Sequence, residues 1–242
     1  MNKLLTTLFA LSVACATSLA QAQAPAASAP AAAPEAAAAS AARTGTPAGA
    51  KSIEAKAAMC IGCHGIKGYQ ASFPEVHKVP MISGQSGKYI AAALTAYKNG
   101  DRKHPTMRSI AEGLSEQDIN DIAAWYESHG KDGAKPLAEK PSREPNAQVT
   151  ALLNKAACAS CHGANFSKPI DPSYPKLGGQ HADYLFVALK AYKSENNPTV
   201  GRNNGVMGAI AKQFSNAELK ALSNYMSSID GELSIKPEPR FR

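Results

Sequence analysis

Cys60-Ile61-Gly62-Cys63-His64 and Cys158-Ala159-Ser160-Cys161-His162 are two copies of one pentapeptide, Cys-x-x-Cys-His. This spacing is typical of covalent attachment of a c-type haem. The two thiols can form thioethers to the vinyl groups of one porphyrin, and the adjacent histidine then lies beneath the iron as proximal ligand. A single copy would also fit a redox or zinc pair. Two copies in matching surroundings predict a protein with two covalently bound haem c groups.

The expected roles within these motifs follow from position. The haem-attaching residues are Cys60, Cys63, Cys158 and Cys161, and the proximal iron ligands are His64 and His162. The remaining cysteine, Cys15, lies near the N-terminus. If it is removed during export, no thiol is left for a disulfide or for a thiolate axial ligand.

The N-terminus predicts an exported protein. Residues 1–24 are expected to form a signal peptide, with Lys3 in its positive start and a mostly apolar run over residues 4–14. The candidate cleavage positions follow Ala20, Ala22 and Ala24. An uncleaved membrane anchor is the alternative, but the apolar run is shorter than the ~20 residues that a spanning helix needs.

Composition then divides the rest of the chain. Residues 25–50 consist almost entirely of Ala, Pro, Ser, Gly and Thr, which predicts a disordered tether. Two lobes follow at 51–130 and 147–242, joined by a charged linker at 131–146 that contains three prolines. The formal net charge is +7, but no dense basic run with interleaved aromatics occurs, so nucleic acid is not an expected partner.

The two lobes are an internal repeat with helical spacing and no β-type alternation. Each contains a helix with Cys-x-x-Cys-His, a Pro-x-[Ile/Leu]-[Ser/Gly]-Gly-Gln element, a second helix, a polar loop that leads to a methionine, and a last helix that opens with a capping box. The paired positions are Pro80–Gln85 and Pro175–Gln180, Tyr97 and Tyr192, Met107 and Met207, and Ser115 and Ser215. The repeat predicts an all-α fold of two tandem lobes. Each lobe is small for a stable core, so we expect it to close around its haem.

The recurring methionines are the expected sixth ligands. Met107 and Met207 occupy the same place in the two lobes, each eight residues before the serine of its capping box. His77 and His104 could instead make the first lobe bis-histidine, but neither has a counterpart in the second lobe. A ligating histidine usually donates its other ring N–H to a carbonyl, and Pro80 and Pro175 are the candidate acceptors.

The chain resembles the dihaem cytochromes c, and the cytochrome c4 family in particular, over nearly all of residues 51–235. The resemblance rests on the segments CIGCHG, CASCHG, PMISGQ, PKLGGQHADYL, IAEGLSEQDINDIAAWY and IAKQFSNAELKALSNY. It implies two mono-haem cytochrome c domains related by a pseudo-twofold axis, with haems close enough for electron exchange. It further implies a periplasmic protein that passes electrons from a cytochrome bc-type donor toward a terminal oxidase or reductase, with peripheral membrane association as an option.

We therefore expect an electron carrier and not an enzyme, because histidine and methionine would fill both axial positions of each iron. The alternatives are a cytochrome subunit of a dehydrogenase, similar to a flavocytochrome, and a haem enzyme with one open iron site. A partner-docking face is expected near the first methionine, where basic residues outnumber acidic ones. Its candidate residues are Lys98, Arg102, Lys103 and Arg108.

Overall fold

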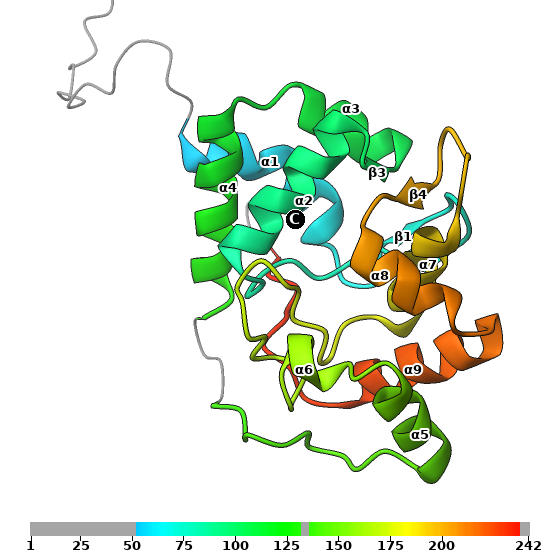
Figure 1. Ribbon diagram of the computed structural model, residues 1–242. Coiled ribbons are helices and arrows are strands. Elements are labelled where there is room, and N and C mark those ends of the chain that lie inside the picture. Colours follow the sequence, from blue (N-terminus) through cyan, green and yellow to red (C-terminus); the bar gives the residue numbers. More distant parts are fainter. Residues whose placement is uncertain (1–51, 132–135, 238–242) are drawn as a thin grey trace, which may run out of the picture. The chain divides into compact units, whose positions relative to one another are not determined.

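Both lobes of the repeat fold into helices in the same order, which confirms the all-α prediction (Figure 1). The computed structural model describes residues 52–131 and 136–237, and the expected signal peptide and tether lie outside the described residues. The helices of the first lobe are α1 (Ile53–His64), α2 (Gly87–Asn99), α3 (Pro105–Glu112) and α4 (Glu116–His129). Those of the second lobe are α5 (Ala147–Lys155), α6 (Ala159–His162), α7 (Ala182–Lys193), α8 (Gly205–Lys212) and α9 (Asn216–Ser228).

Two short antiparallel ladders accompany the helices in the described residues. β1 (Gln70–Ala71) pairs with β2 (His77–Lys78) within the first lobe. β3 (Arg102–Lys103) pairs with β4 (Gly201–Arg202) and so joins the two lobes. Strands of two residues are too short to show the alternation by which strands are recognised in a sequence, so neither ladder was predicted.

The last helix of each lobe supplies much of its core. Both predicted capping boxes are present: the Ser115 and Ser215 hydroxyls accept from the N–H groups of Asp118 and Glu218, whose side chains bond back to the serine N–H. The helices bury the predicted apolar faces against α2 and α7, respectively. The buried residues of these faces include Ile119, Ile122 and Tyr126 in α4, and Leu219, Leu222, Tyr225 and Met226 in α9.

The two Cys-x-x-Cys-His segments differ in backbone. In the first lobe α1 runs without interruption through His64. In the second lobe α5 ends at Lys155, and a separate four-residue helix, α6, carries the end of the motif. The break falls at Ala157, whose φ of 46° lies in the left-handed region. The prediction of one short helix for the motif is therefore correct only in the first lobe.

The segments on either side of the second lobe tie the structure together. The described part of the linker packs on this lobe, where the Tyr225 hydroxyl donates to the carbonyl of Arg143 at 3.0 Å. After α9 the chain crosses to the first lobe, where the N–H of Ser234 donates to the carbonyl of Ser83 at 3.0 Å. Among the described residues, no helix has the length and apolar character needed to cross a membrane.

Candidate haem centres

The four motif cysteines are half-buried and unpaired. Cys60 and Cys63 lie one turn apart on α1, so both thiols can reach the edge of one porphyrin. Cys158 precedes α6 and Cys161 lies within it, which keeps the same separation of about one turn despite the break after α5.

The motif histidines are positioned by backbone carbonyls. His64 Nδ1 lies 2.8 Å from the Pro80 carbonyl oxygen, and His162 Nδ1 lies 3.1 Å from that of Pro175. A carbonyl only accepts, so each Nδ1 carries the proton and each Nε2 keeps a free lone pair. Burial lowers the pKa of both histidines against the opposing effect of these bonds, which favours neutral imidazole. The predicted role of the two prolines as acceptors is confirmed.

The two methionines lie on helices and not in loops as predicted. Met107 and Met207 are the third residues of α3 and α8. The N–H of Met107 donates to His104 Nδ1 at 3.4 Å, and the N–H of Met207 donates to Asn204 Oδ1 at 2.9 Å. These N-caps begin two helices, α3 and α8, where the sequence predicted a polar loop. Met107 also packs against the core formed by α2 and α4.

The competing histidines of the first lobe have other contacts. His77 Nδ1 bonds to the Glu75 carbonyl oxygen at 2.8 Å, and its ring stacks on Tyr184 of the second lobe. The ring of His104 caps α3 and packs edge-on against Phe73. Both side chains therefore have structural contacts, within the first lobe for His104 and also with the second lobe for His77.

A cluster of arginines and tyrosines lies where the lobes meet. Arg102 and Arg202 face each other across the β3–β4 ladder. Arg102 donates to the Tyr184 hydroxyl at 2.7 Å and to that of Tyr89 at 3.3 Å, and Arg202 donates to Tyr184 at 3.2 Å. Arg102 also lies over the ring of Tyr97, with 4.6 Å between guanidinium carbon and ring centroid.

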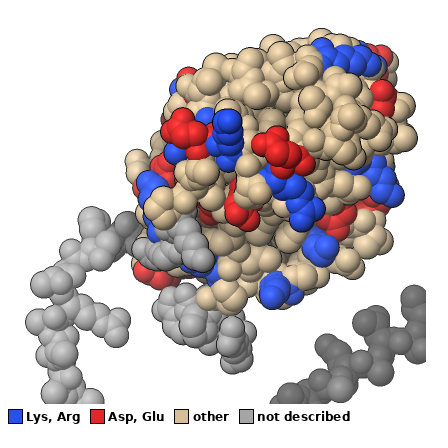
Figure 2. All heavy atoms as spheres, turned by 90° about the horizontal axis from the view of Figure 1, so that it is seen from below, with Lys and Arg blue, Asp and Glu red and all other residues tan. Residues whose placement is uncertain are grey.

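Two of the four residues expected in a docking face lie at this contact, whereas Lys98 and Arg108 are exposed. Arg102 and Lys103 belong to the contact between the lobes, where Lys103 Nζ donates to the Asn197 carbonyl at 2.7 Å. Lys98 bonds to the Leu114 carbonyl, and Arg108 pairs with Glu112. Figure 2 shows acidic and basic side chains interspersed on the face that it draws. Charge counts along a sequence do not reveal burial, but the recurrence of Arg102 and Arg202 five residues before each methionine could have indicated a structural role.

The same cluster fits ligands that carry carboxylates. Among the described residues no carboxylate pairs with Arg102 or Arg202, and Arg102 Nε is buried without a hydrogen-bond partner. Two half-buried guanidiniums without a carboxylate partner would be stabilised by a bound anion. Burial raises the pKa of Tyr184, but the two guanidiniums outweigh it and lower the value to about 8, which shows how positive the site is. Each haem carries two propionates, so the described residues suit this group.

The repeated motif, the buried histidine that leaves Nε2 free, and the matching helices define a c-type cytochrome with two haem domains. A family model described as cytochrome c matches residues 47–130 and again 146–230. The chain is 30% identical over 191 residues to cytochrome c4 of Stutzerimonas stutzeri, which covers 74% of this chain and 89% of the relative. Identity to cytochrome c4 of Pseudomonas aeruginosa is 30% over 185 residues, which covers 73% and 86%, respectively.

Solved structures agree with these relatives. The cytochrome c4 structure from Acidithiobacillus ferrooxidans has a TM-score of 0.52 and 26% identity, and the match covers 71% of this chain and 99% of that chain. Reduced cytochrome c4 from Pseudomonas stutzeri has a TM-score of 0.52 and 27% identity, with 74% and 97% covered. The chain belongs to the cytochrome c4 family. It is a dihaem electron-transfer protein with two covalently bound c-type haems.

A further relative has a more specific name. The thiosulfate dehydrogenase electron acceptor of Stutzerimonas stutzeri strain A1501 is 27% identical over 192 residues, which covers 76% of this chain and 83% of the relative.

Proposed function

We propose that the protein is a periplasmic carrier of single electrons, with one haem held between His64 and Met107 and the other between His162 and Met207. Each bound haem supplies an iron that exchanges one electron. The observation that carries the proposal is the equivalent placement of the two methionines, each third in a helix whose N-cap accepts from the methionine N–H. A filled sixth position leaves no site for substrate, so the protein itself is not an enzyme.

The chain's own residues would do three things for these groups. The motif cysteines attach the porphyrins, and the Pro80 and Pro175 carbonyls hold the proximal rings in the tautomer that leaves Nε2 free. Arg102 and Arg202 would neutralise propionates at the contact between the lobes. With ligands that do not rearrange, electron exchange needs little reorganisation.

The partners of this proposal are redox proteins on both sides. A cytochrome bc-type donor and a terminal oxidase or reductase acceptor fit a carrier that diffuses between complexes. The similarity to a relative named as the electron acceptor of thiosulfate dehydrogenase supports a second candidate donor, a periplasmic dehydrogenase. The proposed domains are the signal peptide (1–24), the tether (25–50), the two haem domains (51–130 and 147–242) and the linker (131–146).

Carbon monoxide binding tests the filled sixth positions. We expect no spectral change when carbon monoxide is added to the reduced full-length protein. Met107→Ala and Met207→Ala should each open one iron, so that half of the haem binds the gas. Met59→Ala is the matched control, because Met59 is 66% exposed on α1 and should leave both irons closed. If the wild-type protein binds carbon monoxide at one haem, one iron is open and the haem-enzyme alternative replaces this proposal.

A further inference from the structure

Two buried glutamines cross between the lobes. Gln85 lies in the turn before α2 and is 4% exposed, and Gln180 lies in the equivalent turn before α7 and is 3% exposed. Each belongs to the Gly-Gln end of the repeated element that begins at Pro80 or Pro175. Neither was singled out as functional from the sequence.

The side chain of Gln180 bonds to the first lobe at both ends of its amide. Its Oε1 accepts from the N–H of Met81 at 3.1 Å, and its Nε2 donates to the carbonyl of Met81 at 2.9 Å. Oε1 also accepts from the N–H of His181 at 3.0 Å. Two N–H groups thus point at the same atom, which fixes that atom as the oxygen of the amide.

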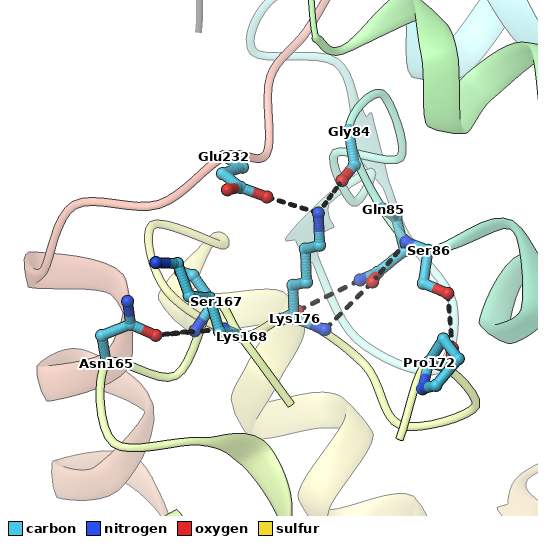
Figure 3. Close-up of polar contacts among 9 residues, drawn as sticks. All are labelled: Gly84, Gln85, Ser86, Asn165, Ser167, Lys168, Pro172, Lys176 and Glu232. Carbon is cyan, nitrogen blue, oxygen red and sulfur yellow. Dashed lines mark hydrogen bonds and ion pairs between the residues drawn. The ribbon is translucent and has the colours of Figure 1, made fainter. Parts of the chain in front are cut away.

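Gln85 makes the reciprocal contact with the second lobe (Figure 3). Its Oε1 accepts from the N–H of Lys176 at 3.0 Å, and its Nε2 donates to the carbonyl of Lys176 at 3.1 Å. Oε1 also accepts from the N–H of Ser86 at 2.9 Å. The ammonium of Lys176 bonds to the Gly84 carbonyl at 2.8 Å and pairs with Glu232, which closes this side of the contact.

The backbone holds both glutamines in place. The N–H of Gly84 donates to the Tyr126 carbonyl of α4, and the N–H of Gly179 donates to the Met226 carbonyl of α9, each at 2.9 Å. Gly84 has a φ of +85°, and a Cβ atom there would lie 2.4 Å from the carbonyl oxygen of Glu232. Glycine is therefore required at this position, and the side chain of Gln85 is directed across the contact by a fixed turn.

The peptide groups that these glutamines contact are the ones that hold the motif histidines. The N–H of Met81 and the carbonyl of Pro80 belong to the same peptide group, and that carbonyl accepts from His64 Nδ1 at 2.8 Å. The N–H of Lys176 likewise shares a peptide group with the carbonyl of Pro175, which accepts from His162 Nδ1. A continuous chain of hydrogen bonds therefore runs from each glutamine, through one peptide, to the histidine of the opposite lobe.

We propose that Gln180 and Gln85 are positioning residues that tune the haem of the opposite lobe: Gln180 acts on the haem held by His64, and Gln85 on the haem held by His162. An acceptor on the N–H side of an amide polarises the group and strengthens its carbonyl as an acceptor. A stronger acceptor at Nδ1–H makes the imidazole a better donor to iron. The better donor stabilises the oxidised iron and lowers its reduction potential. This inference rests on the proposed ligation by His64 and His162.

The reduction potentials of the two haems, measured separately, test whether each glutamine acts on the haem of the opposite lobe. In Gln180→Met the acceptor is removed at similar side-chain size, and the potential of the first-lobe haem should rise more than that of the second. Gln85→Met should give the opposite order. The measurement is a redox titration of the full-length holoprotein followed by NMR, with the haem resonances assigned by comparison with Met107→Ala and Met207→Ala.

Ser86→Ala is the matched control for loss of a contact between the lobes. The Ser86 hydroxyl donates to the Pro172 carbonyl of the second lobe but does not touch the Pro175–Lys176 peptide. This variant should not shift the reduction potential of one haem more than that of the other. Gln180→Glu, unlike Gln180→Met, should not raise the potential of the first-lobe haem, because a carboxyl group keeps the acceptor that faces the N–H of Met81.

A second readout remains if a methionine variant fails to fold with both haems. The proton on His64 Nδ1 should move upfield in the NMR spectrum of reduced Gln180→Glu when the buried carboxyl protonates, because its acceptor weakens. Equal shifts of both potentials, or a larger shift of the haem in the glutamine's own lobe, would overturn the crossing. Failure of the ligation itself would appear separately, as carbon monoxide binding by the wild-type protein.

Discussion

At the scale of single residues, two backbone carbonyls fix the tautomers of His64 and His162, the proposed proximal ligands. Pro80 and Pro175 accept the Nδ1 protons of His64 and His162, so each imidazole is held in one tautomer and one ring orientation. Proline is suited to this position because its fixed φ restrains the backbone that presents the carbonyl. These two hydrogen bonds leave each Nε2 atom free in the folded protein.

The carboxylate of Asp171 shows a residue-scale effect that pH can measure. Hydrogen bonds from the Ser173 hydroxyl and N–H, and then Lys88 of the first lobe, lower its pKa to about 2 from an ordinary 3.8. A folded pKa below the unfolded one means that the ionised group adds stability above pH 3.8, and that this contribution is lost as pH falls toward 2.

We predict that Asp171→Asn is less stable than wild type at pH 6, because a neutral amide accepts more weakly from Ser173 and no longer pairs with Lys88. The difference should shrink as pH falls toward about 2. Urea unfolding of the oxidised holoprotein across this range is the measurement. Asp230→Asn, at an exposed position after α9, is the control. A difference that does not depend on pH would contradict the assignment.

Two examples show which single-residue roles could be predicted from the sequence and which could not. The roles of Pro80 and Pro175 as acceptors followed from the chemistry of a ligating histidine and from their equivalent places between the motif and the next helix. The recurrence of Arg102 and Arg202 hinted at a structural role, but the partners of Arg102 could not be predicted. Its environment depends on β4, about a hundred residues away in the chain, and a local excess of positive charge looks the same on a surface as in a buried cluster.

At the scale of elements, caps decide where the methionines lie. Asn204 Oδ1 accepts from the N–H of Met207 and His104 Nδ1 accepts from that of Met107, which starts α8 and α3 at these turns. The capping boxes of α4 and α9 were predictable, since they combine two residue types at fixed spacing. The histidine cap and the break at Ala157 were not, because neither residue type favours the conformation it adopts.

We predict that Asn204→Ala destabilises the protein by about 1 kcal/mol, and that it weakens the proposed bond from Met207 to iron before the rest of the protein unfolds. The first turn of α8 loses the acceptor for the N–H of Met207. On heating the oxidised protein, the far-red methionine-to-iron band should therefore fall in two steps, with the second-lobe haem first. Ser215→Ala, which uncaps α9, should lower global stability by a similar amount without separating the steps. Equal behaviour of the two variants would show that the cap does not support the ligand.

At the scale of the whole described structure, the two lobes form one unit through reciprocal contacts. The β3–β4 ladder, the crossing glutamines and the arginine–tyrosine cluster are each built from equivalent residues of the two lobes. Three ion pairs join the two lobes: Lys78–Asp183, Lys88–Asp171 and Lys190–Glu75. A fourth, Lys176–Glu232, joins the second lobe to the segment after α9, and Lys176 also bonds to the carbonyl of Gly84 in the first lobe.

The repeat predicted two lobes of one architecture but not how they meet. Equivalence of Met107 and Met207 is visible as spacing, because each lies a constant distance from its capping box. A contact between lobes instead depends on side chains that bond to distant backbone, as Gln85 does to Lys176, and no local pattern encodes it. For the same reason the sequence could not show that Arg102 and Lys103, two residues of the expected docking face, contact the second lobe.

The absorption spectrum of the oxidised full-length protein tests the central claim most directly. The far-red methionine-to-iron band should have the intensity of two haems, and Met107→Ala and Met207→Ala should each remove half of it. Two matched His/Met centres in an electron carrier predict this result. A wild-type band of half strength, accompanied by a high-spin signal, would mean that one iron lacks its methionine, and it would contradict the account.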